Sequence, residues 1–361
     1  MECALAPLLP LLERERASGG ALALGILVHT AGSTYRKAGA LVLIAANGDY
    51  AGLISGGCLE ADLAEHARTV MASGQARLVQ YDLRSGDDLI WGLGLGCEGA
   101  MHIMLVRLAP ENRYQPLALL ERALRAHTAC AIGVVCESHD ERTPAGSLAL
   151  PPESDEAGPG ALASPAVATA LRACALSGET RWLELPGLRL FLLPLWLPPQ
   201  VLLLGAGPDA LPVVEFAARL GWKLTLVDHR PAYAVPAHFP QAEAVRLVHP
   251  PELPGVLDLG AFEAAVVMSH HLSSDLAYLR ALCRSAIPYV GLLGPAVRRE
   301  RLLAELGADA ELLRGRLHAP VGLPLGGRTP EAIALAIVAE LQSFLSTQRR
   351  AGHAPGRIVH G

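Results

Sequence analysis

The pattern of strand, turn and helix that begins at residue 200 constrains the fold of this chain more than any other feature. Residues 201–204 form an apolar run typical of a buried strand, a Gly-Ala-Gly turn follows, and 211–220 shows the apolar spacing of a helix. A second apolar strand at 223–227 ends in Asp228, about 20 residues after the turn. In a dinucleotide-binding βαβ unit the glycines admit the pyrophosphate and such an acid binds a ribose. The pattern therefore predicts a Rossmann-like domain with a parallel sheet in the C-terminal half.

Gly205, Gly207 and Asp228 are the candidate nucleotide-binding residues of this half. Two neighbouring residues oppose that use. Pro208 removes an N–H group where a helix start usually offers one to phosphate, and Asp209 adds negative charge where a pyrophosphate would lie. An NAD(P)-dependent oxidoreductase is therefore one alternative function, although the sequence shows no evident catalytic acid–base set to accompany it.

Polar residues follow a later strand of the same half. A strand predicted at 264–268 brings His270 and then Asp275 to the carboxyl edge of the sheet, where open α/β folds bind ligands. The two side chains could form a polar ligand site, or a structural hydrogen bond between strand end and helix. Asp228 has a similar alternative, since it could pair with Arg230 instead of a ribose.

A second strand-to-helix turn lies in the N-terminal half, within the sequence GLISGGCLE. Ser55, Gly56 and Gly57 permit a sharp turn that exposes backbone N–H groups, which makes them candidates for binding a phosphate. Cys58 is predicted in the first turn of the following helix, where the positive end of the helix dipole favours a thiolate. The alternative is a buried structural cysteine on a tight turn.

Three further residues are candidates for the same site. Cys97 is a second candidate thiolate, in the glycine-rich stretch 91–99 (WGLGLGCEG). Arg36, in a polar loop at 31–39, either binds an anion in a bidentate manner or is a surface charge. Glu60 either caps or orients the first turn. The remaining cysteines are predicted to be packing residues: Cys3, Cys130, Cys136, Cys174 and Cys283.

Composition limits the classes of function. The chain has 361 residues and a formal net charge of −5, so a general nucleic-acid or membrane-surface role has no electrostatic support. Its seven cysteines include no C-x-x-C pair, and no secretory signal precedes them, which favours a reducing cytosol and a cytoplasmic protein.

The length and the proline positions predict two domains. The most hydrophobic run, 190–204, is interrupted by prolines, so two strands joined by a linker are expected rather than a membrane-spanning helix of roughly 20 apolar residues. We expect an α/β domain at 1–197 and the Rossmann-like domain at 198–361. Residues 139–165, rich in Pro, Ser, Glu, Asp and Gly, are expected to form an exposed loop insert in the first domain.

Several segments together resemble the XdhC/CoxI family, the accessory proteins of molybdenum hydroxylases. They occur in the family's order over nearly the whole chain, which is more specific than any single motif. The segments are GSTYRKAGA (32–40), GLISGGCLE (52–60), GLGLGCEG (92–99), VLLLGAG (201–207), VDHRP (227–231), MSHHLSSD (268–275), GLLG (291–294) and PVGLPLGGRTPEAIALAIVAEL (320–341). The SGGCLE sequence is similar to the CoxI-type branch.

This resemblance implies an accessory factor rather than an enzyme. Such a factor would bind the molybdenum cofactor (molybdopterin), support its sulfuration and deliver it to a client hydroxylase of the xanthine dehydrogenase type. It also implies a homodimer, and a cysteine desulfurase is the candidate sulfur donor. A docking scaffold that binds partners without the cofactor is a further alternative.

The chemistry of molybdopterin assigns roles to the candidate residues. The backbone of residues 55–57 would hold its phosphate, with added charge from Arg36. Cys58 and Cys97 would supply thiolates to molybdenum, a metal that accepts soft sulfur ligands. We expect these two cysteines to meet in space.

Overall fold

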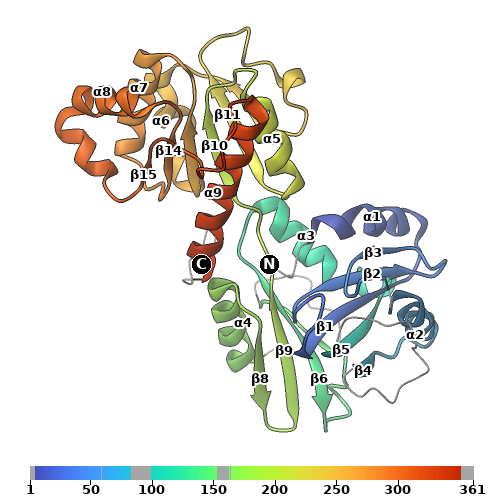
Figure 1. Ribbon diagram of the computed structural model, residues 1–361. Coiled ribbons are helices and arrows are strands. Elements are labelled where there is room, and N and C mark those ends of the chain that lie inside the picture. The colour runs from blue at the N-terminus through green and yellow to red at the C-terminus, as the bar shows by residue number, and fades with distance from the viewer. Residues whose placement is uncertain (1–4, 58, 83–98, 153–161, 163, 351–361) are drawn as a thin grey trace. The chain divides into compact units, whose positions relative to one another are not determined.

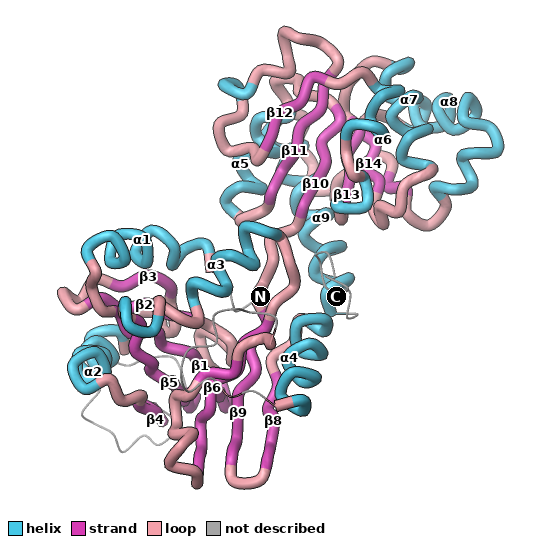
Figure 2. Tube along the Cα trace, turned by 180° about the vertical axis from the view of Figure 1, so that it is seen from behind, coloured by secondary structure: helices cyan, strands magenta, loops and turns pink. Residues whose placement is uncertain are grey.

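The computed structural model describes residues 5–57, 59–82, 99–152, 162 and 164–350. The chain divides after Leu197 into two compact units, called here the N-terminal unit and the C-terminal unit. Each unit has its own sheets (Figures 1 and 2). Each also has its own hydrophobic cores. The two are therefore described separately.

A five-stranded antiparallel sheet forms the first part of the N-terminal unit (Figure 1). Its strands, in spatial order, are β3 (Tyr50–Gly52), β2 (Leu41–Ala45), β1 (Leu22–Gly32), β5 (Gly99–Leu108) and β4 (Arg77–Asp82). The long strands β1 and β5 pair from Leu22 opposite Leu108 to Gly32 opposite Gly99. Because β1 is central, the first seven of its residues are buried, which explains the unbroken apolar run in the sequence.

Helices cover both faces of this sheet. On one face, α1 (Leu9–Ser18) and α3 (Leu117–Ala126) share a hydrophobic core with Leu24 and Ile26 of β1. On the other face, α2 (Glu60–Ser73) shares a core with Ala23 of the same strand. Because side chains alternate between the two faces of β1, this strand contributes residues to two separate hydrophobic cores.

A four-stranded antiparallel sheet completes the N-terminal unit. Its strands, in spatial order, are β7 (Leu148–Ala149), β6 (Ala131–Ser138), β9 (Leu188–Pro194) and β8 (Arg181–Leu185). The helix α4 (Pro165–Ser177) packs on one face, and the other face joins the core that contains α1 and α3. The strand β7 lies inside 139–165 and its Ala149 is fully buried, so this part differs from the expected exposed loop because it pairs with β6.

The C-terminal unit is built on a six-stranded parallel sheet. Its strands, in spatial order, are β12 (Ala244–Leu247), β11 (Lys223–Asp228), β10 (Gln200–Leu204), β13 (Ala264–Val267), β14 (Val290–Leu292) and β15 (Leu317–His318). The pairings are parallel throughout. This confirms the predicted α/β class and the Rossmann-like sheet.

Helices cover both faces of the parallel sheet as well. One face carries α5 (Ala210–Arg219) and α9 (Pro330–Arg350), and the other carries α6 (Leu253–Val256), α7 (Leu272–Cys283) and α8 (Ala296–Leu306). None of the helices in the described part of the chain is both long enough and apolar enough to cross a membrane.

Arg316 stabilises the C-terminal end of α7 from a distant part of the chain. Its two terminal guanidinium nitrogens donate hydrogen bonds to four main-chain carbonyls between Leu282 and Ile287, at 2.7 to 3.1 Å. Its Nε donates to the carbonyl of Leu312 at 2.9 Å. The last carbonyls of a helix have no partner within the helix, so one planar side chain satisfies several of them at once.

We predict that Arg316→Met lowers the free energy of unfolding of the C-terminal unit by about 2–4 kcal/mol, because it removes all of these donors together. Urea unfolding followed by circular dichroism measures the change. Arg314→Met is the matched control, since that side chain is exposed and forms a surface ion pair with Glu311. The control is expected to change stability by less than about 0.5 kcal/mol. Equal midpoints for the two variants would show that Arg316 has no such role.

Candidate functional site

The register of the antiparallel sheet brings to one edge the strand ends that flank three of the sequence motifs. The strands β1, β3 and β4 all end at this edge, and β2 and β5 begin there. The polar loop that contains Arg36 leaves the end of β1, and the turn with the first candidate cysteine leaves the end of β3. The segment 83–98, which contains Cys97, connects the end of β4 to the start of β5. The edge is staggered, because β1 and β5 extend beyond the end of β3.

A partly buried hydrogen bond joins the elements that flank two of these segments. The hydroxyl of Tyr81, near the end of β4, donates to the Oδ2 of Asp62 in the first turn of α2, at 2.7 Å. Burial raises the pKa of Tyr81 and the bond to the Asp62 carboxylate raises it further, so the hydroxyl stays protonated and keeps its donor. His66 lies one helical turn beyond Asp62, with its Nε2 3.5 Å from the same carboxylate oxygen. The start of α2 is therefore attached to the strand that leads into 83–98.

Glu60 organises the turn between β3 and α2. Its carboxylate accepts hydrogen bonds from the N–H of Ser55 at 3.0 Å, from the Ser55 hydroxyl, and from the N–H of Leu59 at 3.2 Å. The Ser55 hydroxyl oxygen in turn accepts from the N–H of Gly57 at 3.3 Å. Ser55 and Glu60 are both buried. Glu60, predicted from the sequence to cap or orient the first turn of the helix, therefore stabilises the base of the turn that precedes it.

The tip of the turn remains accessible. Gly56 and Gly57 are exposed, and a Cβ added to either would have no described atom within 4 Å. Because the N–H groups of Ser55 and Gly57 already donate within the turn, the N–H of Gly56 is the donor at the tip without a partner in the described part of the chain. The predicted phosphate contact would use this group first.

The helix begins later than the sequence analysis predicted. α2 starts at Glu60 with Leu59 as its N-cap, so position 58 precedes the helix instead of lying in its first turn. The reason is that the Glu60 carboxylate and the Ser55 hydroxyl both bind the N–H of Leu59, which ends the turn before the helix starts. Cys58 and Cys97 themselves lie outside the described residues.

The loop that contains Arg36 lies over the start of β5. A Cβ on Gly99 would lie 2.5 Å from the carbonyl oxygen of Ser33 and 2.6 Å from Thr34, so only glycine permits this approach. The Thr34 hydroxyl donates to the carbonyl of Arg36 at 2.8 Å and accepts from Lys37 at 3.2 Å. Arg36 is half-buried and Lys37 is exposed. Two cationic residues therefore belong to the loop that approaches the start of β5.

Cys3 lies outside the described residues. The other four cysteines predicted to be packing residues are buried and form no disulfide, as packing residues would. Burial raises the pKa of Cys136 and of Cys174 to about 12, and it also raises the pKa of Cys283. Such thiols are unreactive at neutral pH. Among the residues that the structure describes, no group of three or more His, Cys, Asp or Glu side chains is placed to hold a metal ion.

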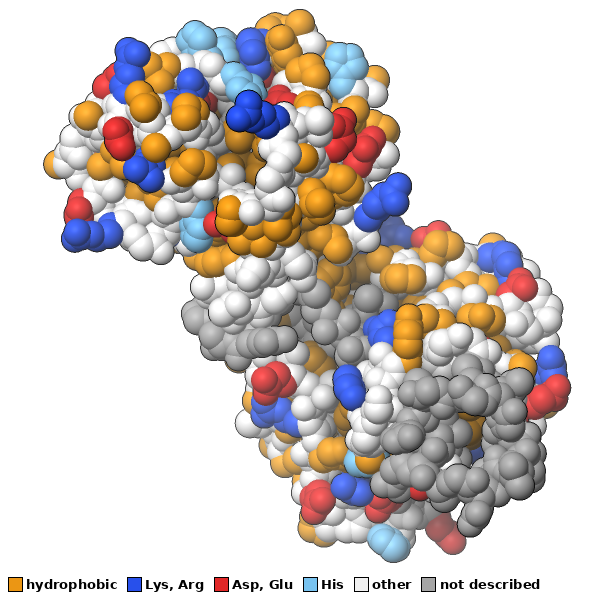
Figure 3. Space-filling view, in the orientation of Figure 1, with side chains coloured by type: hydrophobic (Ala, Val, Ile, Leu, Met, Phe, Trp, Pro, Cys, Tyr) orange, Lys and Arg blue, Asp and Glu red, His pale blue; other side chains and the backbone are white. Residues whose placement is uncertain are grey.

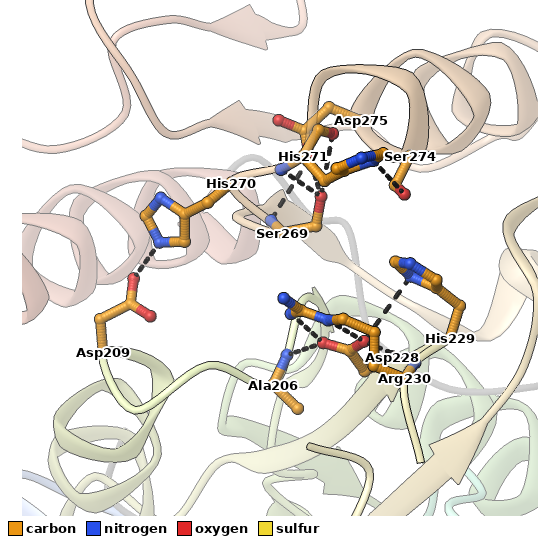
Figure 4. Close-up of polar contacts among 10 residues, drawn as sticks. All are labelled: Ala206, Asp209, Asp228, His229, Arg230, Ser269, His270, His271, Ser274 and Asp275. Carbon is orange, nitrogen blue, oxygen red and sulfur yellow. Dashed lines mark hydrogen bonds and ion pairs between the residues drawn. The ribbon is translucent and has the colours of Figure 1, made fainter. Parts of the chain in front are cut away.

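The carboxyl edge of the parallel sheet is the second candidate site. Gly205 has φ +128°, and a Cβ there would lie 2.5 Å from the carbonyl oxygen of Met268, so the turn after β10 needs a glycine. Asp228 is fully buried at the end of β11, and its carboxylate accepts from the N–H of Ala206 and from Arg230 (Figure 4). Gly207 has its Cα beside Asp209, with 2.6 Å between an added Cβ and the Oδ1 of that residue.

His270 and Asp275 have different partners. The Nε2 of His270 lies 2.7 Å from the Oδ2 of Asp209, across the edge from the start of α5 (Figure 4). Asp275 accepts instead from the N–H and hydroxyl of Ser269 and from the guanidinium of Arg298. The two residues therefore do not form the joint polar pair that the sequence allowed, because His270 contacts Asp209 whereas Asp275 binds Ser269 and Arg298.

Sequence reasoning missed several residues that define the two sites. Asp62 and Tyr81 are 19 positions apart and carry no motif, so only the packing of α2 on β4 reveals their bond. Arg298 reaches Asp275 from the next helix, 23 positions on. No sequence signal pairs Asp209 with His270, which are 61 positions apart.

Comparison with known proteins gives a consistent assignment. The model of the XdhC and CoxI family matches residues 15–82, and the model of the XdhC Rossmann domain matches residues 201–341. A Bacillus subtilis protein named as a probable xanthine dehydrogenase component is 31% identical over 335 residues, which cover 91% of this chain and 93% of that protein. The molybdenum cofactor insertion chaperone PaoD of Escherichia coli is 26% identical, over 90% of this chain and 84% of its own.

A solved structure has the same fold over nearly the whole chain. The crystal structure of a protein described as a xanthine dehydrogenase from Bacillus halodurans aligns with a TM-score of 0.77 and 29% sequence identity, covering 95% of this chain and 96% of the other. The matched family models and the similarity over almost the full length agree with the motifs in the sequence. The chain belongs to the XdhC and CoxI family.

Proposed function

We propose that this protein binds the molybdenum cofactor at the edge of its antiparallel sheet and serves as an accessory factor in maturation of a molybdenum hydroxylase. In this role it supports sulfuration of the cofactor and delivers it to a client enzyme of the xanthine dehydrogenase type. The chain is homologous to a molybdenum cofactor insertion chaperone, which supports the general role. The cofactor contact, the sulfuration step and the client are the parts we propose.

One observation carries the proposal: the sheet register and the Asp62–Tyr81 hydrogen bond bring the segments that flank both candidate cysteines to one edge. Cys58 lies four residues before Asp62, and Cys97 lies two residues before the start of β5. A site that needs two thiols would require this juxtaposition of segments distant in sequence.

The described residues fit the polar half of molybdopterin. The exposed tip at Gly56 offers a backbone N–H to a phosphate, and Arg36 and Lys37 supply positive charge in the adjoining motif. Glu60 would fix the turn without contacting the ligand, since its carboxylate is committed to Ser55 and Leu59. Cys58 and Cys97 would supply soft thiolate ligands to the molybdenum of the cofactor. This metal would provide the redox chemistry of the client hydroxylase.

The partners and location follow from the same role. We propose a client hydroxylase, a cysteine desulfurase as sulfur donor, a homodimer and a cytoplasmic location. On the face drawn in Figure 3, the described basic and acidic side chains are interspersed, without a basic stripe of the kind that binds nucleic acid. Contacts with folded protein partners are compatible with such a surface.

We predict that Cys58→Ser lowers the pterin that copurifies with the protein at least tenfold, because the oxygen of serine is a hard ligand and a poor substitute for a thiolate at molybdenum. The measurement is pterin fluorescence after oxidation of protein purified from a molybdopterin-producing host. Cys283→Ser makes the same chemical change in the C-terminal unit, where the thiol is buried, and should keep its pterin.

Absence of pterin from both the wild type and Cys58→Ser would contradict cofactor binding and would favour a docking scaffold. Equal pterin in both variants would keep cofactor binding but remove Cys58 from the site. A second measurement is the activity of the client hydroxylase in cells that lack the wild-type gene and express Cys58→Ser. A docking scaffold should still activate the client in these cells, whereas a chaperone that needs Cys58 should not.

We predict that Glu60→Ala destabilises the N-terminal unit by about 1–3 kcal/mol, since buried donors of Ser55 and Leu59 lose their acceptor. Glu60→Gln keeps one acceptor oxygen and should therefore reduce the free energy of unfolding by less than Glu60→Ala does. Urea unfolding followed by circular dichroism gives the free energies. Glu65→Ala, on the exposed side of the same helix, is the control and should change stability by less than about 0.5 kcal/mol.

The same variants test the positioning role of the turn. If Glu60 only stabilises the fold, Glu60→Gln that remains folded should retain as much pterin as wild type. If it positions the tip, pterin retention should fall in Glu60→Gln at a temperature where the protein is still fully folded. Unchanged stability in Glu60→Ala would contradict the hydrogen-bond assignment itself.

A further inference from the structure

The Rossmann-like fold implies a dinucleotide, and the C-terminal unit allows a direct test of that implication. In this fold the ligand lies at the carboxyl edge of the sheet, where the strand order reverses. Here the reversal lies between β10 and β13, since β10 is followed by β11 on one side and pairs with β13 on the other. A dinucleotide at this point needs a free acid for its ribose and free N–H groups for its phosphates.

The acid is already occupied. Asp228 accepts from the N–H of Ala206 at 2.9 Å, from the N–H of Arg230 at 2.9 Å, and from the Nε and Nη2 of Arg230 at 2.9 and 2.7 Å. Burial acts to raise the pKa of Asp228, yet these hydrogen bonds and the Arg230 charge lower it below its usual value. The carboxylate thus has four donors from its own chain and both of its oxygens are in use.

Arg230 is held in place by a second contact. Its guanidinium lies over the ring of Tyr233, 3.9 Å from the ring centroid. A ribose that approached Asp228 would have to displace a bidentate ion pair and this stacking contact together. The neighbouring His229 also points toward Asp228, with 3.6 Å between its Nδ1 and the Oδ1 of the acid (Figure 4).

The turn after β10 has few donors left for a phosphate. The N–H of Gly205 donates to the carbonyl of Val227, and the N–H of Ala206 donates to Asp228. At the start of α5, the N–H groups of Ala210 and Leu211 donate to carbonyls within the turn. Pro208 and Pro212 have no N–H at all. Only the N–H groups of Gly207 and Asp209 lack a partner in the described part of this turn.

A carboxylate also lies where the phosphates would bind. Asp209 is the N-cap residue of α5, but its side chain does not cap the helix and instead reaches His270. His270 has φ +59°, a left-handed conformation that is uncommon for a residue with a side chain. The pair Asp209–His270 therefore spans the reversal point from the first turn of α5 to the loop after β13 (Figure 4).

We infer that the C-terminal unit does not bind a dinucleotide in the usual Rossmann pose, because Arg230, Pro208 and Asp209 close the site from within. Arg230 takes the place of the ribose, Pro208 removes a phosphate donor, and Asp209 repels the phosphate. The sheet is retained as a scaffold, while the side chains at its ligand edge are occupied by contacts within the chain. These contacts all lie within the C-terminal unit and are independent of cofactor binding at the antiparallel sheet.

The experiment uses ADP-ribose, the part of NAD that carries both the ribose and the phosphates, titrated into the full chain by calorimetry. The unsubstituted protein should show no binding tighter than about 1 mM. The triple variant Pro208→Gly, Asp209→Ser, Arg230→Ala restores the missing N–H, removes the opposing charge and frees Asp228. It should bind ADP-ribose at least tenfold more tightly than this limit.

Two controls assign the effect to the named groups. Arg219→Ala removes a cation at the far end of α5 and should leave ADP-ribose unbound. The double variant Pro208→Gly, Asp209→Ser changes two residues of the turn and leaves Arg230 on Asp228, so it should bind at least tenfold more weakly than the triple variant.

Three results would overturn the inference. The first is binding of ADP-ribose to the unsubstituted chain below the millimolar range. The second is equal affinity in the double and triple variants, which would show that Arg230 does not close the ribose position. The third is a triple variant with native circular dichroism that binds nothing. If the triple variant does not fold, the unsubstituted chain still decides the first point. Binding of ADP-ribose by the double variant at about 0.1 mM or tighter would then show that Arg230 does not close the ribose position.

Discussion

A buried carboxylate at the junction of strand and helix is the interaction on which both units of this protein depend. Glu60 and Asp275 are used in the same way, since each accepts hydrogen bonds from the N–H and the hydroxyl of a serine in the turn that follows the preceding strand. Asp228 accepts from the N–H of Ala206 in the neighbouring turn. Buried N–H groups at such turns have no partner in the sheet or the helix, so an acid within reach satisfies them and fixes the turn.

The sequence predicted the parallel sheet because its signals are local. Apolar runs of strand length, helical spacing between them and the glycine at 205 all act within a few residues. The close approach of Met268 to Gly205 explains why that glycine is needed, although the sequence alone did not show it. The antiparallel strands were also visible as apolar runs. Their order was not, because the pairing of β1 with β5 joins residues more than 60 positions apart.

The partners of the polar residues could not be predicted in the same way. An acid such as Asp275 has several cations within reach of a predicted sheet edge, and the choice of Arg298 depends on how α8 packs. The start of α2 was predicted too early because the glycines and apolar spacing do not reveal that Glu60 and Ser55 capture the N–H of Leu59. Hydrogen bonds of this kind compete with helix formation at the first turn, and their outcome depends on burial.

The two strand-to-helix turns differ in what their acids leave available, and this difference separates their possible functions. In the parallel sheet the acid, its arginine and two prolines leave only the N–H groups of Gly207 and Asp209 without a partner in the described turn, and the Asp209 side chain lies at the same edge. In the antiparallel sheet Glu60 binds the base of the turn and leaves the tip at Gly56 exposed. A fold-level comparison would place ligand binding in the Rossmann-like unit. The exposed N–H of Gly56 with Arg36 and Lys37 in the adjoining motif favours the other unit for an anion, because the Rossmann-like turn carries the Asp209 carboxylate. Function in this chain is therefore better inferred from the hydrogen bonds and charges of each turn than from the fold that contains it.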